Sequence, residues 1–335
     1  MKIKFSKGLR MKKIYKILFV ALLSVITTGC NANSEVKPAK AEFKPDTPQS
    51  VQVFSAKNAD GKITPKTIGA AFEATGLKMG GNNNMNKPFE LRFKKVHYKT
   101  YHLAMFRHTE LSKKIVQKAP QFGRLVPLTM SIWSDGDTMN VSTLTLNGLA
   151  RAANLPVTDP DLIAYADVIK KALKAAMPNG EYKPLNHKVL EPKATYEINF
   201  TAELDPDADF DEWRDGFEME FEGEMEPVGF MFPNYTNLNE EIFDKAGIDD
   251  FDFYITYSIC KFDVIFPVSK DTPEAGAYAP CSLYVYKKKG ENTVHIGYLG
   301  VDNWIKTLDI TDQHAIDQLK DAESKINDIL SELTE

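Results

Sequence analysis

The chain has 335 residues, of which 43% are hydrophobic and 26% are charged, and its formal net charge is -5 at pH 7. This length and composition are enough for two domains of common size, each with its own core. No basic stripe interleaved with aromatic residues occurs, so the sequence predicts no nucleic-acid partner.

The first thirty or so residues have the pattern of a bacterial export signal. A basic stretch over 12–16 precedes an apolar run over 17–26, and the pair Gly29-Cys30 closes the segment. The apolar run is too short to span a bilayer comfortably. We therefore expect a signal segment here rather than a transmembrane helix.

This segment resembles the lipobox of bacterial lipoproteins, although Thr27 stands where such motifs usually carry an aliphatic residue. The resemblance implies that residues 1–30 form a lipoprotein signal peptide and that Cys30 is lipidated as the first mature residue. Its acyl chains would hold the protein on a membrane. Because Asn31, not Asp, follows the cysteine, we expect a periplasm-facing envelope protein on the outer rather than the inner membrane.

The region after Cys30 divides into a tether and two similar halves. Residues 31–49 are rich in Lys, Pro, Ala and Glu, and this composition predicts a flexible tether. The halves predict domains over 50–178 and 193–335, with a Pro-rich linker over 179–192 between them. A repeat of this size dictates how the whole chain is interpreted.

The first half predicts a strand, a helix, a group of strands and a second helix, in chain order. A helix begins after Thr64 and ends at Gly76, and a second helix begins after Asp159. A Gly-centred hairpin turn at Gly136 joins the last two strands. The strands are expected over 51–54, 89–93, 101–106, 125–133 and 141–146.

The second half repeats this order. Its first helix is capped by Asp209 or Asp211 and ends at Gly223, its hairpin turns at Gly290, and its last helix begins after Asp312. The strands are expected over 196–200, 228–232 or 251–257, 259–266, 278–286 and 294–299. The fold class is therefore α+β, with two tandem units that each place two helices on one face of an antiparallel sheet.

The run from Ala119-Pro120 through Gly123 to Pro127, with the strand, hairpin and helix after it, resembles the domain-of-unknown-function 302 (DUF302) family. The resemblance covers about 50–177 and implies a fold like the saddle unit of TATA-binding protein, without its DNA function. The second half departs from the pattern. Its segment 267–279 lacks the apolar helical face that Leu111 and Ile115 provide in the first half.

Three histidines of the first half, His97, His102 and His108, invite a metal interpretation that strand geometry opposes. Positions 97 and 102 face opposite sides of a strand, and 102 and 108 lie about 20 Å apart. We predict no metal site and no cofactor. A loop histidine with Met79 or Met85 suits copper or haem, which stays open as an alternative.

Other polar groups also have simpler interpretations. The acidic run 205–211 has no Gly where a calcium loop needs one, so we expect helix capping. Residues 80–84 predict a flexible loop. We predict Cys260 and Cys281 to be free buried thiols, because antiparallel pairing would place Cys260 near the far end of the strand of Cys281.

The remaining candidates are aromatic. We expect the two copies to pack as an internal pseudo-dimer with a ligand cleft at the seam, near Tyr284, Tyr286, Trp133 and His102. No convergent catalytic set occurs. The sequence therefore predicts a lipid-anchored envelope protein that binds a small ligand or a protein partner without catalysis. A haem- or copper-handling redox protein and a structural envelope scaffold are the alternatives.

Overall fold

The structure, a computed structural model, describes residues 48–190 and 196–335. The predicted signal peptide, Cys30 and most of the predicted tether lie outside the described residues. No helix in the described ranges is long and apolar enough to cross a membrane.

The first unit is built on a six-stranded antiparallel sheet with the order β2-β3-β4-β5-β1-β6. The strands are β1 (Val51–Lys57), β2 (Lys78–Asn84), β3 (Tyr101–Arg107), β4 (Leu128–Asp135), β5 (Thr138–Leu144) and β6 (Glu181–Lys183). The helices are α1 (Pro65–Ala74), α2 (Asn86–Phe93), α3 (Thr109–Lys118), the 3-10 helix η1 (Pro120–Leu125), α4 (Leu146–Ala153) and α5 (Pro160–Ala176).

The second unit has a five-stranded antiparallel sheet with the order β7-β11-β10-β9-β8. Its strands are β7 (Glu197–Glu203), β8 (Met231–Asn237), β9 (Phe251–Cys260), β10 (Cys281–Lys288) and β11 (Thr293–Leu299). Its helices are α6 (Phe210–Met225), the short η2 (Asn239–Phe243) and η3 (Asp244–Ala246), α7 (Phe262–Asp271), the 3-10 helix η4 (Pro273–Ala277), α8 (Val301–Thr307) and α9 (Gln313–Leu333).

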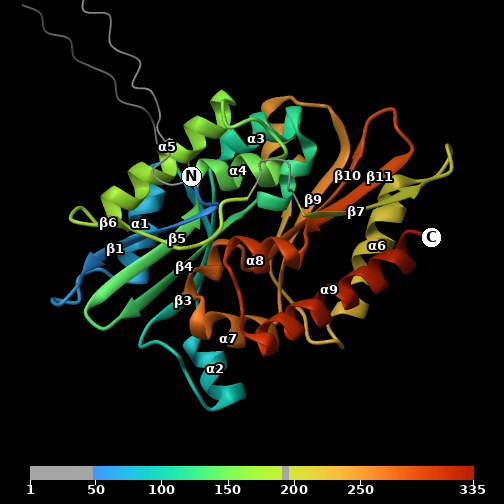
Figure 1. The fold of residues 1–335 in the computed structure, drawn as a ribbon. Helices are drawn as coiled ribbons and strands as arrows, with labels where there is room; N and C mark the ends of the chain where they lie inside the picture. The colour runs from blue at the N-terminus through green and yellow to red at the C-terminus, as the bar shows by residue number, and fades with distance from the viewer. Residues whose placement is uncertain (1–47, 191–195) are drawn as a thin grey trace, which may run out of the picture. The chain divides into compact units, whose positions relative to one another are not determined.

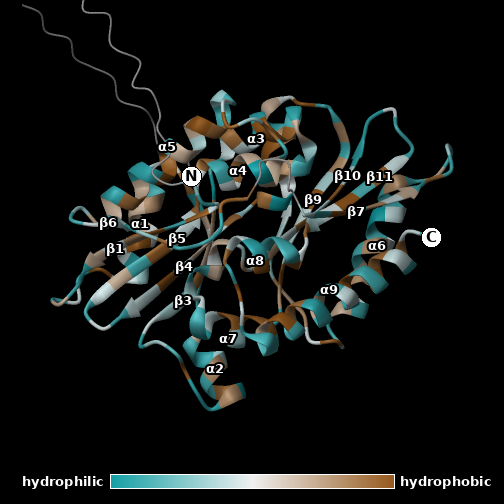
Figure 2. Ribbon diagram, in the orientation of Figure 1, coloured by the Kyte–Doolittle hydropathy of each residue, from teal (hydrophilic) through white to brown (hydrophobic). Residues whose placement is uncertain are grey.

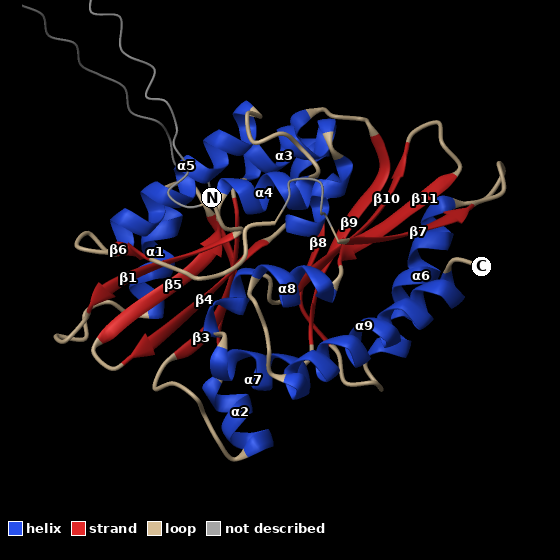
Figure 3. Cartoon of the chain, in the orientation of Figure 1, coloured by secondary structure: helices blue, strands red, loops and turns tan. Residues whose placement is uncertain are grey.

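The two units share one topology, which confirms the predicted α+β fold class. Apart from β6, the strands follow each other in the same order in both sheets (Figure 1, Figure 3). Details recur as well. The register shifts between Met79 and Gly81 on β2 and between Met231 and Asn234 on β8, and the peptide bonds before Pro127 and Pro280 are both cis.

Each sheet packs its own helices on one face. Phe72 of α1 contacts Phe106 of β3 at a ring separation of 5.2 Å, and Phe221 of α6 contacts Tyr257 of β9 at 5.4 Å. Helix α9 carries hydrophilic and hydrophobic residues in alternating bands (Figure 2), and its buried residues fall on one side. The amphipathic pattern in the sequence therefore identified the buried side of this helix correctly.

The opposite face of each sheet is covered by the 3-10 helix of the other unit. Tyr101 Oη of β3 donates a hydrogen bond to the carbonyl of Pro273 in η4 at 3.4 Å, and Tyr254 Oη of β9 donates to the carbonyl of Pro120 in η1. Gly123 of η1 lies directly on β9 and β10, since a Cβ there would be 2.0 Å from Tyr254 Oη. The contacts between the units are thus reciprocal.

Several expected helix starts and turns are confirmed. Asp159, Asp209 and Asp312 each accept hydrogen bonds from backbone N–H groups of the helix that follows, and Thr64 does the same for α1. Gly136 and Gly290 adopt positive φ in the two hairpins, and Gly76 does so after α1. Gly223 lies inside α6 instead of ending it; Gly229, with φ +92, follows that helix.

The strand expected over 89–93 is wrong, because these residues belong to α2. The alternation of Phe89, Leu91 and Phe93 fits a strand, but Phe89 and Phe93 are four apart and share a helical face. Both rings pack on Phe266, at 5.1 and 4.0 Å, while Leu91 is 67% exposed. Packing against Phe266 therefore favours the helical period of 3.6 residues over the strand period of two.

The strand expected over 259–266 is also wrong, since β9 ends at Cys260 and α7 begins at Phe262. Pro267 lies inside α7, and an internal proline argues against a helix in sequence reasoning. The buried side chains of Val264, Ile265 and Val268 stabilise the helix nonetheless. The second unit therefore has an apolar helical face equivalent to that of Leu111 and Ile115, and it begins before the segment 267–279 in which it was expected.

Two loop predictions also need correction. Residues 80–84, expected as a flexible loop, belong to strand β2 at one edge of the first sheet. The expected linker contains β6, which pairs with β1. The low apolar content of both segments reflects their position at sheet edges, where fewer side chains are buried.

Candidate functional site

The described residues form an open cavity of about 300 Å³ at the seam between the two units, called the seam cavity below. Both units contribute to its wall. The lining residues are Asn83, Asn84, Met85, Pro88 and Leu103 from the first unit and Met231, Phe232, Pro233, Cys260, Phe262 and Pro280 from the second. None of these side chains carries a formal charge, so the cavity suits an uncharged, mainly apolar molecule.

Elements from both sheets position the wall. Leu103 of β3 is buried on the face that contacts the second unit, and Met85, directly after β2, is 4% exposed. Phe262 at the start of α7 packs its ring against Phe89 of α2 at 6.4 Å. Rigid elements therefore hold the apolar side chains, and exposed Asn83 and Asn84 form the polar part of the wall.

The shared topology provides an internal comparison for this site. Placing Pro127 on Pro280 and counting along the chain pairs Arg107 with Cys260, and the same count pairs Lys78 with Met231. The strand registers agree with this alignment, because Lys78 opposes Arg107 and Met231 opposes Cys260. Each lining residue therefore has an equivalent position on the other side of the seam.

At the other end of the seam, the residues equivalent to the cavity wall form a polar network centred on Arg107. The guanidinium contacts Glu241, and its Nη1 donates to Thr236 Oγ1 at 3.3 Å. Lys78 Nζ lies 3.2 Å from Glu241 Oε2. Burial opposes ionisation of Glu241, but the hydrogen bonds and charges of Arg107 and Lys78 outweigh it and lower its pKa.

The two ends of the seam have thus diverged. Thr236 and Glu241 of the network are the counterparts of Asn83 and Pro88 in the seam cavity. One end is closed by an ion pair, and the other is uncharged and open. Four residues of the network, Arg107, Lys78, Thr236 and Glu241, correspond to Cys260, Met231, Asn83 and Pro88 at the open end. Because all four positions differ, we take the open end as the candidate site.

Cys260 in the cavity wall is a poor nucleophile. Burial raises the pKa of its thiol to about 12, and burial likewise raises that of Cys281 to about 12. No disulfide joins these two free cysteines; Cys260 is buried as predicted, Cys281 is only half-buried, and the expected geometry was wrong. Cys281 opposes Ile259, the neighbour of Cys260, because β9 ends at Cys260 instead of starting there.

The four aromatic and histidine candidates lie outside the wall of the seam cavity. Tyr284 Oη donates to Asn199 Oδ1 at 3.0 Å, and Tyr286 stacks on Tyr254 at 5.2 Å. Trp133 is buried on β4. His102 Nδ1 lies 2.9 Å from Asn82 Oδ1 on the neighbouring strand. The structure does not bring these four residues together at one site.

The three histidines of the first unit have separate partners. His97 Nε2 lies 3.0 Å from the carbonyl of Phe266, and His108 Nδ1 accepts from the N–H of Leu111 at the start of α3. Burial lowers the pKa of His97, His102 and His108. Among the described residues, no group of three or more His, Cys, Asp or Glu side chains is placed to hold a metal ion.

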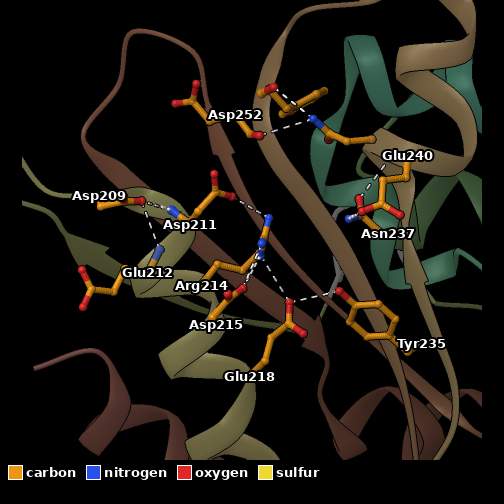
Figure 4. Close-up of polar contacts among 12 residues, drawn as sticks. Asp209, Asp211, Glu212, Arg214, Asp215, Glu218, Tyr235, Asn237, Glu240 and Asp252 are labelled. Carbon is orange, nitrogen blue, oxygen red and sulfur yellow. Dashed lines mark hydrogen bonds and ion pairs between the residues drawn. The ribbon is translucent and has the colours of Figure 1, made fainter.

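The acidic segment at the start of α6 is engaged in capping and in ion pairs (Figure 4). Asp209 Oδ1 accepts from the N–H groups of Asp211 and Glu212, as the sequence predicted. Arg214 lies among three carboxylates, at 2.8 Å from Asp211, 2.9 Å from Asp215 and 3.6 Å from Glu218. Its charge compensates the acidic cluster locally.

The fold and the seam cavity define a two-unit α+β protein with a candidate ligand site between the units. Residues 203–333 match the family described as "Domain of unknown function DUF302". A solved structure of an uncharacterised conserved DUF302 protein from Bacillus stearothermophilus is similar to part of the chain. It has 17% sequence identity and a TM-score of 0.33, and the match covers 42% of this chain and 100% of that chain. No curated protein matches the sequence.

The family match lies in the second unit, which the sequence analysis judged the more divergent. The misplaced helix α7 caused that judgement. The same error hid the seam cavity, because it obscured the correspondence between Arg107 and Cys260. The sequence did contain a signal for this site. A residue-by-residue comparison of the halves finds a charged side chain, Arg107, in one half and an uncharged one, Cys260, in the other.

Proposed function

We propose that the protein binds a small, mainly apolar ligand in the seam cavity, as a non-catalytic, lipid-anchored protein of the cell envelope. The asymmetry of the seam carries this proposal. At one end Arg107 and Glu241 close the space, and at the equivalent end Cys260 and Pro88 line a cavity of about 300 Å³. A volume of this size lies at the lower end of ordinary small-molecule sites.

The duplicated scaffold supplies the walls of this site. We propose that the two units form an internal pseudo-dimer. The reciprocal hydrogen bonds of Tyr101 with Pro273 and of Tyr254 with Pro120 support this pairing. A site built at such a seam needs both copies, which gives a reason for keeping the duplication in one chain.

A fluorescence titration tests the ligand site. The probe is the neutral apolar fluorophore phenylnaphthylamine, and the protein is the full chain with Cys30→Ala. We expect saturable binding that Met231→Trp weakens by about tenfold or more, because the larger ring occupies the cavity. The control is Met219→Trp on α6, where the side chain is 71% exposed. Equal binding by both variants would refute the site.

The anchor is tested separately. Cys30 lies outside the described residues, and the proposal rests on the lipobox resemblance of the sequence. Cells grown with labelled palmitate are expected to label the wild-type protein but not Cys30→Ala. Membrane fractionation then distinguishes the outer membrane, expected from Asn31, from the inner one.

A further inference from the structure

A second, smaller cavity lies beside the seam cavity, inside the second unit. It has a volume of about 50 Å³ and is called the inner cavity below. Cys260 and Pro280 line both cavities. The two cavities are therefore adjacent, and the inner cavity lies between the second sheet and α9.

The inner cavity has a visible origin in the sequence. Counting from the two aligned prolines, Ala279 and Ala322 stand where the first unit has Val126 and Ile169. In the first unit both larger side chains are fully buried. At these two positions the second unit has smaller side chains, which leaves space locally in a packed core, whereas Leu319 is larger than its counterpart Ala166.

The wall of the inner cavity is mainly apolar, although the buried indole Nε1 of Trp304 in this wall has no hydrogen-bond partner among the described residues. Its two charged residues are already engaged: Glu323 Oε1 accepts from the N–H of Val301 at 2.6 Å, and Lys261 Nζ lies 3.4 Å from Asp321. The remaining wall is apolar, aromatic or thiol. The other lining residues include Ile259, Val264, Ile265, Leu319, Ala322 and Ile326.

The polar wall of the seam cavity has the opposite character. Asn84 Oδ1 accepts from the N–H of Asn86 at 2.9 Å, which leaves its amide NH2 group as a donor. Exposed Asn83 offers a second amide beside it. These donors suit an uncharged acceptor such as an ester or amide carbonyl, because no cationic side chain lines the cavity to pair with a free carboxylate.

We infer that the ligand is a single linear acyl chain with an uncharged ester or amide head, held with its head near Asn83 and Asn84 and its tail past Cys260 in the inner cavity. This inference rests on the proposed function of the seam cavity. The inner cavity, at about 50 Å³, exceeds the roughly 10–15 Å³ that one water molecule needs, yet it is small. It therefore selects a chain end over a ring system.

Chain length is the measurable consequence. Saturated monoacylglycerols of increasing length compete with phenylnaphthylamine for the full chain carrying Cys30→Ala. Each added methylene is expected to improve competition by about fourfold until the inner cavity is full. Beyond that length the gain stops.

Variants that change the inner cavity are expected to move this optimum. Ala322→Ile restores the residue type of the first unit and should shorten the preferred chain by about three carbons, with short-chain binding unchanged. Ile326→Val is a milder change and should lengthen it by about one carbon. Ser324→Ile, on the exposed face of α9, is the control and should leave the optimum in place.

The possible outcomes separate the two proposals. If the chain carrying only Cys30→Ala binds neither the fluorophore nor any monoacylglycerol, the ligand site at the seam is refuted together with this inference. If it binds them but Ala322→Ile and Ile326→Val both keep the wild-type chain preference, only the acyl-chain inference is overturned. A shortened optimum for Ala322→Ile or a lengthened one for Ile326→Val, with Ser324→Ile unchanged, supports the inference.

Discussion

Arg107 and Cys260 occupy equivalent positions in the two units, each as the last residue of a strand, yet Arg107 closes its end of the seam and Cys260 lines a cavity at the other. The Arg107 guanidinium is almost fully buried and pairs with Glu241 across the units. Cys260 has no charge and leaves a cavity open. The same fold, present twice in the chain, thus closes the seam with an ion pair at one end and leaves a cavity at the other.

Arg107 is therefore expected to stabilise the protein. Arg107→Met keeps most of the side-chain volume but leaves Glu241 with only Lys78, and we expect the free energy of unfolding to fall by about 2 kcal/mol. This figure is below that of a fully buried pair because the Glu241 side chain is 35% exposed. Urea unfolding at neutral pH measures the loss.

Lys78→Met is the matched control for this prediction. It removes the other cation of the same carboxylate, but the Lys78 side chain is 62% exposed. Exposed pairs contribute about 0–1 kcal/mol, so the control should unfold close to the wild-type midpoint. Equal losses for the two variants would mean that Arg107 does not hold the seam.

Close packing between the units gives a second prediction. A Cβ at Gly123 would lie 2.0 Å from Tyr254 Oη and 2.8 Å from Tyr284 Cβ, so Gly123→Ala forces the units apart. We expect a loss of about 3 kcal/mol or more in the free energy of unfolding. The measurement is again urea unfolding.

The control, Gly216→Ala, should change stability in the opposite direction. Gly216 lies inside α6, and nothing is within 4 Å of the added carbon. Alanine is the better helix former, so a gain of about 0.8 kcal/mol is expected. If Gly123→Ala were as well tolerated as this control, the described contact between η1 and the second sheet would be incorrect.

The sequence predicted the architecture well where its patterns were local. The caps at Asp159, Asp209 and Asp312 and the turns at Gly136 and Gly290 depend on a few adjacent residues, and the structure has them where expected. Local side-chain hydrogen bonds and positive φ angles have the same requirements in any fold.

The sequence analysis was wrong where contacts between residues far apart in the sequence determine whether a segment forms a helix or a strand. The helix α2 is fixed by the stacking of Phe93 on Phe266, and α7 by the burial of Val264 and Val268 despite Pro267. Neither contact is visible in a single sequence. The seam cavity depends on both helices, so its residues could not be grouped before the structure placed Phe262 and Pro88 together.

The thiols give a third prediction. In the chain with Cys30→Ala, Cys260 and Cys281 are the remaining cysteines, and burial raises the pKa of both to about 12. At about pH 8 only about one thiol in ten thousand is then ionised. We expect iodoacetamide to react at least a hundredfold more slowly than with the urea-unfolded chain.

Mass spectrometry after timed alkylation measures this protection at each cysteine. Ligand in the seam cavity should slow the reaction of Cys260 further, since this residue lines the cavity. Rapid labelling of Cys260 in the folded protein would indicate an ionised, accessible thiol and would favour a redox role over simple binding.

The histidines of the first unit give the last prediction, a loss of stability in mild acid. Burial lowers the pKa of His97, His102 and His108, so each binds a proton more readily in the unfolded chain than in the folded protein. Their contribution is complete above the unfolded value of about 6.5 and is lost as the pH falls below it. Glu218, whose pKa burial raises, acts in the opposite direction at lower pH.

Urea midpoints at about pH 7.5 and about pH 5.5 are expected to differ, with the lower stability in acid. The triple variant His97→Gln, His102→Gln and His108→Asn should flatten this difference, and Asn at position 108 keeps a side-chain acceptor for the cap of α3. The neighbouring charges are retained: Lys95, Lys270 and Asp271 near His97, and Glu110 near His108. An undiminished pH dependence in the triple variant would place the acid-sensitive groups elsewhere in the chain.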